Sequence, residues 1–398
     1  MNIAFFTNNY LPYQGGVAIS IKTFKDELEK LGHNVFVFAP KYPEYKDREK
    51  NVFRMPSFKV HSNGFYLPLP FTHFVRQKFK ALHIDIIHAH HFYMLGETAM
   101  RLAKENNIPL VFTHHTQYEK YLHYIPFDRG VTEPIVKNLV MSFCNQCDMV
   151  LAPSNFIKNS LVVKGINTKI QVLTTGVDTS KCIAMNVRNK LGISPGMKII
   201  LYAGRIAREK NLEFLVRSMI NIIGKKPDTR GIIAGKESDD GNTKARLERM
   251  IKEAGMQQKI IFTGQLDCEE LKAYYREADI FLFTSRSETQ GLVILEAMAQ
   301  GTPVIAVDDP SLREFVLNGK NGYLVPEDGS FSQRAIDVLK DESKMKRLSI
   351  GAKETARNFS KRKLATRLVI LYKEVLAQNG QKTNSNIYKP FTASWLRW

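Results

Sequence analysis

The chain contains 398 residues, of which 44% are hydrophobic and 24% are charged, a composition that is ordinary for a folded protein and argues against extensive disorder. Lysine and arginine total 57 against 39 aspartates and glutamates, so the net charge of +18 favours a partner with a negatively charged surface. Four cysteines exclude a disulfide-rich scaffold. We expect no signal peptide, because the start MNIAFFTNNYLP lacks a basic n-region, and no transmembrane helix, because no apolar run approaches the ~20 residues that a span requires.

Strand and helix patterns alternate through the first half of the chain. Short runs rich in Ile, Val and Phe predict strands at 2–6, 35–38, 84–88, 110–113 and 149–152. Longer stretches with helical spacing lie between them; one covers 17–31 and ends at Gly32, a residue type common at helix C-termini. This alternation predicts a parallel sheet covered by helices.

A second series of strand patterns follows. These strands are predicted at 199–202, 231–234, 260–263, 280–283, 304–307 and 323–325. Residues 174–197 are polar and lack a clear period, so we interpret them as the connection between domains. The sequence thus predicts an α/β protein with two doubly wound, Rossmann-like domains that face each other across a cleft. The predicted divisions are 1–173, 174–375 and a C-terminal tail at 376–398.

Positive charge is concentrated in the first half and in the tail. Residues 1–175 hold 20 basic and 13 acidic residues, and the last 48 residues hold 10 and 2. Residues 53–80 contain five basic residues, seven aromatic rings and no acid, and 71–82 have helical spacing. Such a helix can place its rings among lipid headgroups and its cations against anionic lipid. The membrane-binding residues predicted here are Phe71, Phe74, Arg76, Lys78, Phe79 and Lys80. Alternatively, the rings pack into the domain core and the basic face is solvated.

The tail carries both tryptophans of the chain, Trp395 and Trp398. Tryptophan favours the interface between membrane and water, so we predict a second membrane contact here. The alternative is that the two rings dock on the protein's own surface.

Two loops that follow strands of the second series carry groups suited to a phosphorylated ligand. In open α/β sheets, ligands bind beyond the carboxyl ends of the strands. After the strand at 199–202 come Arg205 and Lys210, a pair of cations that suits two linked phosphates. The alternative for this loop is a solvated basic turn.

The loop after the strand at 280–283 leads into a helix that we expect to begin near Thr289 or Gln290. Free N–H groups at such a helix start can hold an anion. Glu288 and Glu296 are eight positions apart, so the carboxylates would lie at the helix start and about two turns further along. Carboxylates accept paired hydrogen bonds from sugar hydroxyls, although both could equally be ordinary surface glutamates of a helix.

These residues resemble a known family. Glu288 and Glu296, in the setting SETQGLVILEAMAQGTPVIA, match the E-x7-E signature of the family-4 retaining glycosyltransferases, which have the two-domain GT-B fold. GRIAREKN resembles that family's phosphate-binding loop, Gly15-Gly16 its glycine loop and Thr113-His114-His115-Thr116 its T-x-H-T strand end. The resemblance extends over about residues 1–375, with four motifs in matching order.

The resemblance implies roles for individual residues. Arg205 and Lys210 would bind the diphosphate of a nucleotide sugar, Glu288 the hydroxyls of the donor sugar and Glu296 the ribose. The backbone at Gln290, Gly291 and Leu292 would lie near sugar and phosphate, and that at Gly264, Gln265 and Leu266 near the base. Gly16 would allow close approach to phosphate, and His115 would lie near the reacting sugar. The predicted catalytic residues are His115, Arg205, Lys210 and Glu288.

The acceptor is indicated by the segment that follows His115. THHTQYEKYLHYIP resembles the subgroup that glucosylates diacylglycerol, and YLPYQGGVAIS fits that subgroup as well. The resemblance therefore implies UDP-glucose as donor, membrane diacylglycerol as acceptor and an α-glucosyl diacylglycerol as product. It also implies a peripheral enzyme on the cytoplasmic face of the cell membrane, bound to an anionic surface. A glycan or a polyprenyl-linked sugar is the alternative acceptor, and an epimerase of the same fold is a further enzyme class.

Three other features of the sequence could indicate a different function: its histidines, a C-x-x-C pair and its net charge. All ten histidines lie between 33 and 123, but ligand spacing with a cysteine or carboxylate is missing, so we expect no metal and no required cofactor. Cys144 and Cys147 form a single C-x-x-C in a helical stretch and are interpreted as helix-face residues. The charge of +18 would also suit a nucleic-acid-binding protein, but the sequence lacks the corresponding motifs, so we expect no nucleic acid partner.

Overall fold

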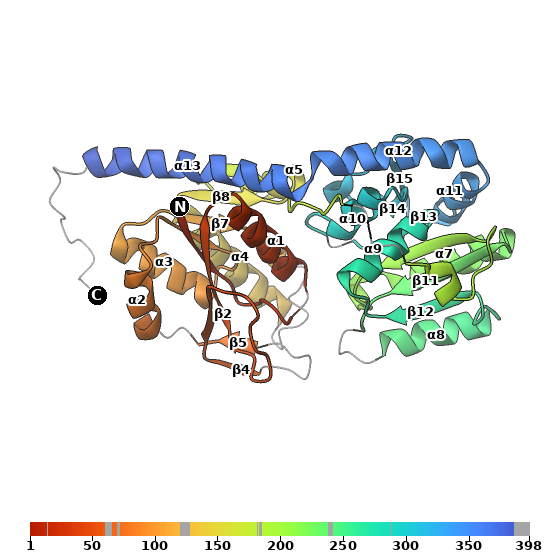
Figure 1. Cartoon of the computed structure of the whole chain (residues 1–398), viewed down its shortest axis with the longest axis horizontal. Helices are drawn as coiled ribbons and strands as arrows, with labels where there is room; N and C mark the ends of the chain where they lie inside the picture. Colours follow the sequence, from red (N-terminus) through yellow and green to blue (C-terminus); the bar gives the residue numbers. More distant parts are fainter. Residues whose placement is uncertain are drawn as a thin grey trace.

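The computed structural model contains two α/β domains that lie side by side (Figure 1). It describes residues 1–13, 15–59, 66–69, 72–119, 128–180, 182, 185–237, 242–286 and 288–385. The helices among these residues include none that is both long and apolar enough to cross a membrane.

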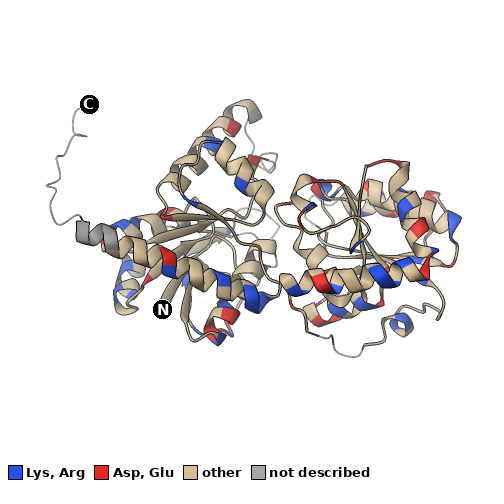
Figure 2. Cartoon of the chain, turned by 90° about the horizontal axis from the view of Figure 1, so that it is seen from above, with Lys and Arg blue, Asp and Glu red and all other residues tan. Residues whose placement is uncertain are grey.

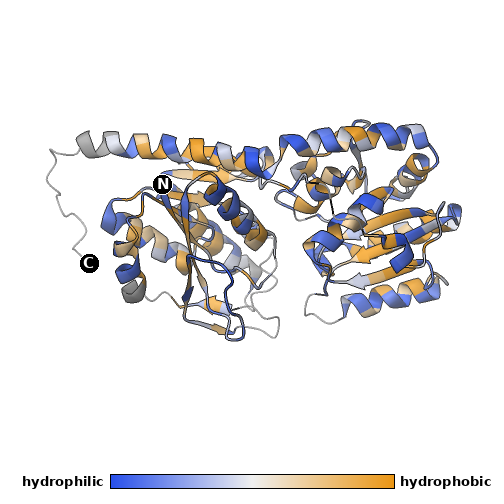
Figure 3. Ribbon diagram, in the orientation of Figure 1, coloured by the Kyte–Doolittle hydropathy of each residue, from blue (hydrophilic) through white to orange (hydrophobic). Residues whose placement is uncertain are grey.

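The first domain is built on a seven-stranded parallel sheet in the order β3-β2-β1-β6-β7-β8-β9. Its strands are β1 (Asn2–Phe6), β2 (Asn34–Pro40), β3 (Val52–Met55), β6 (Ile86–Ala89), β7 (Leu110–Thr113), β8 (Met149–Ala152) and β9 (Ile170–Val172). Ile3 of β1 lies opposite Val35 on one side and Ile86 on the other. The central strands are apolar because helices cover both of their faces, as the strand patterns predicted. Figure 3 shows these hydrophobic strands beneath helices with hydrophilic outer faces.

The strand order changes direction between β1 and β6, so the chain crosses both faces of the sheet. The helices of this domain are α1 (Gly16–Lys30), α2 (Thr72–Ala81), α3 (Leu95–Asn106), α4 (Arg129–Asn145) and α5 (Asn155–Val163). A short antiparallel hairpin of β4 (Ser57–Lys59) and β5 (Tyr66–Pro68) precedes α2. Buried residues of α2 to α5 share one core, and those of α1 belong to the core on the opposite face.

The second domain has a six-stranded parallel sheet in the order β12-β11-β10-β13-β14-β15. Its strands are β10 (Lys198–Ala203), β11 (Thr229–Ala234), β12 (Ile260–Gly264), β13 (Ile280–Phe283), β14 (Val304–Val307) and β15 (Gly322–Val325). Its helices are α6 (Val187–Lys190), η2 (Arg208–Lys210), α7 (Leu212–Lys225), α8 (Thr243–Glu253), α9 (Cys268–Glu277), α10 (Leu292–Gln300), η3 (Pro310–Leu312), α11 (Gly329–Leu339) and α12 (Glu342–Asn358). Here the order reverses between β10 and β13, so the predicted pair of doubly wound domains is confirmed.

The last described helix, α13 (Lys361–Ser385), returns to the first domain and lies along it (Figure 1). Leu368, Leu371 and Tyr372 are almost fully buried, in a cluster with Phe5 and Ile21. The prediction that residues 361–375 belong to the second domain is therefore wrong, because the apolar face of this segment covers the first sheet. Residues 376–385, predicted as tail, continue the same helix. Trp395 and Trp398 lie outside the described residues.

The chain crosses between the domains twice, and the two crossings pair with each other. The Val177 N–H donates to the Phe359 carbonyl at 2.9 Å, and the Lys361 N–H donates to the Val177 carbonyl at 3.0 Å. A Cβ on Gly176 would lie 2.3 Å from the Cα of Lys361, so the crossings touch backbone to backbone. Lys361 also forms an ion pair with Asp178 at 2.7 Å, and we infer that this junction aligns the two domains.

The predicted membrane helix is present as α2, but the ring of Phe79 points inward. Val75 and Phe79 are 0% and 3% exposed and pack in the core of the first domain. The prediction that Phe79 enters a membrane is thus wrong for this structure, because the ring covers the sheet. Arg76, Lys78 and Lys80 are exposed, and Arg76 pairs with Glu105 of α3. Phe71 and the side chain of Phe74 lie outside the described residues.

One cation of the basic stretch is an interior residue. The Arg54 side chain is 12% exposed, bonds to Asp47 and lies within 5.7 Å of the rings of Tyr10, Tyr42 and Tyr45. It also donates to the Leu11 carbonyl at 2.6 Å, which ties the segment after β1 to β3. The stretch 53–80 therefore mixes core and surface positions, and Figure 2 shows lysine and arginine residues spread over both domains.

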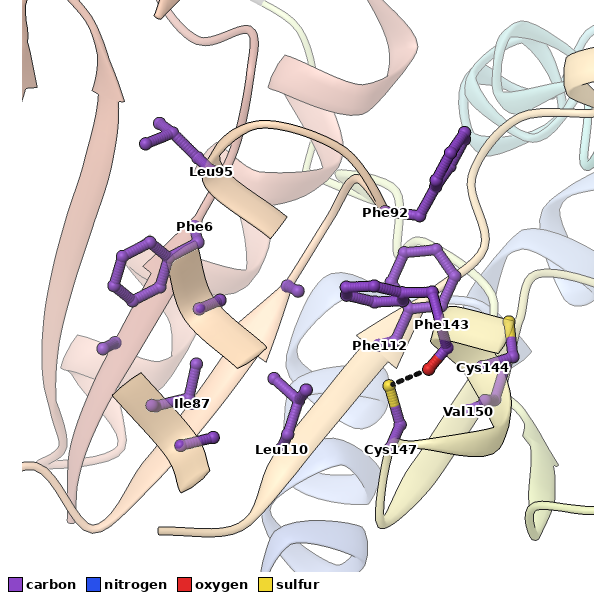
Figure 4. Close-up of a cluster of buried hydrophobic side chains, with 14 of the residues drawn as sticks. Phe6, Ile87, Phe92, Leu95, Leu110, Phe112, Phe143, Cys144, Cys147 and Val150 are labelled. Carbon is purple, nitrogen blue, oxygen red and sulfur yellow. Dashed lines mark hydrogen bonds between the residues drawn. The ribbon is translucent and has the colours of Figure 1, made fainter. Parts of the chain in front are cut away.

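The two cysteines of the C-x-x-C are core residues: Cys144 lies on a face of α4, as predicted, whereas Cys147 follows the end of that helix. Figure 4 shows Cys144 and Cys147 among Phe112, Phe143 and Val150. Burial raises the pKa of the Cys144 thiol to about 12 and also raises that of Cys147, which disfavours the thiolate that redox or metal chemistry needs.

We predict that α13 contributes to the stability of the first domain. Leu368→Ala should lower the free energy of unfolding by about 2–5 kcal/mol, because it removes a fully buried side chain. The matched control is Ile370→Ala on the same helix, where the side chain is 45% exposed and the cost should stay within about 0.5 kcal/mol. Urea unfolding followed by circular dichroism measures both, and equal losses would contradict the placement of α13.

Candidate active site

The loops that follow β10 and β13 meet at the point where the strand order of the second sheet reverses. These strands are direct neighbours, with Ile200 opposite Ile280 and Leu201 opposite Phe281. Residues 204–211 and 284–291 therefore leave the sheet side by side at its carboxyl edge, where α/β sheets bind ligands. The Thr284 hydroxyl donates to the Lys210 carbonyl at 3.0 Å and joins the two loops.

Lys210 and Glu288 form the central ion pair of this site. Lys210 Nζ lies 2.5 Å from Glu288 Oε1, and the two side chains are 13% and 16% exposed. Burial of Glu288 opposes its ionisation and is the largest single effect, but the positive charge and hydrogen bond of Lys210, with a smaller contribution from Arg205, together hold the pKa of Glu288 below its ordinary value. The structure thus brings together two of the four predicted catalytic residues, and both are charged.

Arg205 lies in the same loop but closer to solvent. Its guanidinium is 2.8 Å from Glu209, and its side chain is 39% exposed against 7% for Glu209. The preceding Gly204 touches Gly235 after β11, where a Cβ would lie 1.8 Å from the Gly204 carbonyl oxygen. Because only glycine permits this contact, the backbones of the two loops can pack directly and fix where Arg205 leaves the sheet.

The helix after Glu288 begins later than predicted. α10 starts at Leu292, and Gly291 before it has φ of +68°, a left-handed conformation that favours glycine. Glu288 is therefore a loop residue three positions ahead of this glycine, and its carboxylate is oriented by Lys210 and not by helical periodicity. The first N–H groups of α10 open at the same carboxyl edge, which is the feature expected of an anion site.

Glu296 lies within α10, behind the loop. The Tyr275 hydroxyl donates to Glu296 Oε2 at 3.2 Å, and burial raises the pKa of Glu296. Gly264 is the last residue of β12, the outer strand next to β11, and Gln265 and Leu266 follow it at the same edge of the sheet. Gly264 and Gln265 are exposed, so their backbone can meet a ligand. Apart from Gly16, the predicted donor-binding positions are thus distributed along one edge of the second sheet.

The first domain faces this edge with loops that follow its own strands. The Gln117 amide, four positions after β7, donates to the Glu288 carbonyl at 2.7 Å. The Ser154 hydroxyl, after β8, donates to the Thr289 carbonyl at 3.0 Å. The carboxyl edges of both sheets therefore meet at the loop that carries Glu288.

Gln290 completes the contact between the domains with its side chain. Its amide oxygen accepts from the Thr175 N–H at 2.8 Å, and its amide nitrogen donates to the Thr175 carbonyl at 2.9 Å. The side chain is 5% exposed and pairs with the backbone as a neighbouring strand would. The sequence did not predict that the side chains of Gln117 and Gln290 join the two domains, because no local pattern around either residue indicates a partner so distant in the chain.

His115 and Gly16 occupy the carboxyl edge of the first sheet. Gly16 is exposed and begins α1, and a Cβ there would meet nothing within 4 Å. His115, two residues before Gln117, is partly exposed, and its Nε2 lies 3.0 Å from Nδ1 of His90. His91 lies nearby in sequence, and its Nδ1 accepts from the Asn8 N–H at 3.1 Å. Burial lowers the pKa of the five histidines on this edge, so their rings are neutral near pH 7. They are His88, His90, His91, His114 and His115.

The described residues include no group of three or more His, Cys, Asp or Glu side chains placed to hold a metal ion. What the site offers instead is two fixed cations, a helix start and a carboxylate around one edge. Such an arrangement can stabilise negative charge on a departing diphosphate while the carboxylate binds hydroxyl groups.

Comparison with known proteins identifies the class. Residues 14–181 match the family model described as Glycosyltransferase Family 4, and residues 185–355 match Glycosyl transferases group 1. The fold is therefore that of a GT-B glycosyltransferase. The chain belongs to glycosyltransferase family 4, as the motifs predicted.

Two relatives are similar over nearly the whole chain. The alpha-monoglucosyldiacylglycerol synthase of Streptococcus pneumoniae is 32% identical over 386 residues, which cover 91% of this chain and 84% of the relative. The protein of the same name from Acholeplasma laidlawii is 28% identical over 96% of this chain and 100% of its own. Among solved structures, HepE of Anabaena in complex with UDP and glucose superposes with a TM-score of 0.76 at 18% identity, over 94% and 100% of the two chains. This last likeness shows the fold.

We predict that Glu288→Ala abolishes sugar transfer without unfolding the protein. If Glu288 binds the donor sugar as the resemblance implies, loss of the carboxylate removes those charged hydrogen bonds and also the ion pair with Lys210, so turnover should fall at least about 100-fold. Transfer of radiolabelled sugar to a bacterial lipid extract measures turnover, and a thermal melt confirms folding.

The control for this substitution is Asp228→Ala. Asp228 pairs with Lys226 just before β11, at the amino edge of the same sheet and opposite the site, so its loss should leave turnover near the wild-type value. Near-normal turnover of Glu288→Ala would refute the role assigned to that carboxylate.

Proposed function

We propose that this protein is a retaining glucosyltransferase that moves glucose from UDP-glucose to membrane diacylglycerol and forms an α-glucosyl diacylglycerol. The observation that carries the proposal is the similarity to two alpha-monoglucosyldiacylglycerol synthases along 91% and 96% of this chain. That similarity includes the first domain, where the segment after His115 indicated the same acceptor.

The second domain binds the donor in this proposal. Arg205 and Lys210 neutralise the diphosphate, and the first N–H groups of α10 add positive potential as the bond to glucose breaks. Glu288 accepts hydrogen bonds from glucose hydroxyls and Glu296 from the ribose, and the backbone at 264–266 meets the base. UDP is the nucleotide bound in the HepE structure, which supports its choice here. Because two protein cations face the diphosphate, transfer does not require a metal.

Retention follows from attack on the face that the diphosphate leaves. The hydroxyl of diacylglycerol approaches beside the departing phosphate, which takes up its proton, and no protein carboxylate forms a bond to the sugar. His115 contacts the reacting glucose from the first domain, and Gly16 allows close approach to phosphate.

The acceptor requires contact with a membrane, and α2 supplies the cations for it. Val75 and Phe79 fix one side of α2 on the domain core, which leaves Lys78 and Lys80 on the exposed side. The contact is therefore electrostatic, with anionic lipid headgroups attracting the lysines, and does not depend on insertion of Phe79. We place the enzyme on the cytoplasmic face of the membrane, where UDP-glucose is available, as a peripheral protein with no nucleic acid partner.

The decisive experiment is mass spectrometry of lipid products. Purified protein is mixed with diacylglycerol in phosphatidylglycerol vesicles and with UDP-glucose, UDP-galactose, UDP-N-acetylglucosamine and GDP-mannose together. We expect one new glucolipid with an α-anomeric proton signal in NMR, and none with Glu288→Ala. A labelled glycan or polyprenyl-linked sugar would overturn the acceptor, and consumption of donor without an acceptor would indicate an epimerase.

We predict that Lys78 and Lys80 hold the protein on anionic membranes. Reversal of both to glutamate should lower the partition coefficient to phosphatidylglycerol vesicles at least about 30-fold, since each cation contributes about 1 kcal/mol. UDP binding, measured by calorimetry, should be unchanged.

The matched control reverses Arg249 and Lys252, two exposed cations of α8 in the second domain, and alters the net charge equally. Vesicle sedimentation should separate the two double variants. Equal binding by both would mean that net charge, and not the surface of α2, causes the attraction.

A further inference from the structure

Three histidine rings form a column at the carboxyl edge of the first sheet. The ring centroids of His88 and His90 are 4.3 Å apart, those of His90 and His115 are 5.2 Å apart, and both pairs are stacked. His88 bonds to the hydroxyls of Tyr372 and Thr113, each at 2.6 Å, so α13 and β7 hold the inner end. Phe5 of β1 packs against this column: its ring centroid lies 4.9 Å from that of His90, and the two rings meet edge to face. The rings therefore have little freedom to turn.

His90 has one nitrogen with a partner and one without. Its Nδ1 lies 3.0 Å from Nε2 of His115. Its Nε2 is buried and has no hydrogen-bond partner among the described residues. Each neutral imidazole carries one proton on its two ring nitrogens, and the pair shares a single N–H···N bond. Two assignments are possible, and they differ in the group left unpaired at His90 Nε2.

In the first assignment His90 Nδ1 donates, so His90 Nε2 is an unpaired acceptor and His115 carries its proton on Nδ1. In the second, His115 Nε2 donates, and His90 buries an unpaired N–H. Unpaired buried N–H groups are rarer than unpaired acceptors. We propose that His90 is a positioning residue that fixes His115 as the neutral tautomer with its proton on Nδ1.

The proposal rests on the role of His115 beside the reacting sugar and defines that role. With Nε2 engaged by His90, His115 offers only Nδ1–H to a ligand. This group donates a hydrogen bond to a sugar oxygen and cannot accept the proton of the attacking hydroxyl. Burial lowers the pKa of both rings, which keeps the pair neutral and the assignment stable. The proton of the acceptor is then left to the departing phosphate.

The tautomer is measured directly by NMR on the whole protein labelled with 15N-histidine, without donor or acceptor. Long-range proton–nitrogen correlations distinguish protonated from unprotonated ring nitrogens, and His115→Gln assigns the signals. We expect Nδ1 of His115 to be protonated and Nε2 unprotonated in the wild type, and this pattern to be lost in His90→Phe. A proton on Nε2 in the wild type, or an unchanged pattern in His90→Phe, overturns the proposal.

Two substitutions separate hydrogen bonding from packing in the reaction. His90→Phe keeps a ring but no donor, whereas His90→Asn places an amide N–H at the position of Nδ1. Loss of one hydrogen bond should lower kcat of His90→Phe about tenfold with the KM for the donor sugar within about twofold, and His90→Asn should stay within about threefold of the wild type. Equal losses in both variants, or wild-type turnover in His90→Phe, would show a packing role alone.

Failure of this inference can be told apart from failure of the proposed function. The tautomer is read without any substrate, and the kinetics use whichever acceptor the lipid products reveal. If diacylglycerol is not the acceptor, the NMR result and the kinetic result for the His90 variants can therefore still be interpreted.

Discussion

The hydrogen bonds of residues 288–290 to the first domain fix the geometry on which the site depends. The carbonyls of Glu288 and Thr289 accept from Gln117 and Ser154, and the side chain of Gln290 pairs with the backbone of Thr175. The same loop carries the carboxylate that faces Lys210 at 2.5 Å. A shift of one domain against the other would therefore move the carboxylate relative to the cation. The site is a property of both domains, although its charged residues belong to the second.

In the first sheet the central strands were predictable from sequence and the outer strands β3 and β9 were not, whereas both outer strands of the second sheet, β12 and β15, were predicted. Strands such as β1 and β10 are covered on both faces, so their apolar runs are continuous and easily recognised. β3 is an edge strand that contains Arg54, and β9 is a three-residue edge strand with a polar centre, so neither has such a run. The placement of α13 also escaped prediction. The apolar face formed by Leu368 and Leu371 requires a partner surface but does not specify which domain supplies it.

For the functional residues, too, the sequence predicted some features of the site and not others. Glu288, Arg205 and Lys210 were placed at one edge from spacing alone, because parallel strands end together and their loops converge. The Lys210–Glu288 pair and the hydrogen bonds of Gln290 link residues 78 and 115 positions apart, which no local pattern can encode. For Phe79 the sequence led to a wrong prediction: it was assigned to a membrane contact but lies in the core. An aromatic residue on a basic amphipathic helix suits a lipid surface and a protein core equally well, and only the packing of α2 on the sheet decides between them.

The two sides of the site differ in their electrostatic character, and this difference has a chemical consequence. The second domain presents two cations and an ionised glutamate, whereas the first domain presents histidines whose burial keeps them uncharged. A negative charge that develops during reaction is therefore stabilised on the side of Arg205 and Lys210. A positive charge on His115 would compete with these cations for that negative charge, and burial of much of the ring disfavours that charge. In the proposed reaction, neutral donors on the first domain avoid both effects: they would orient a neutral sugar or alcohol while the field of the second domain acts on the leaving group alone.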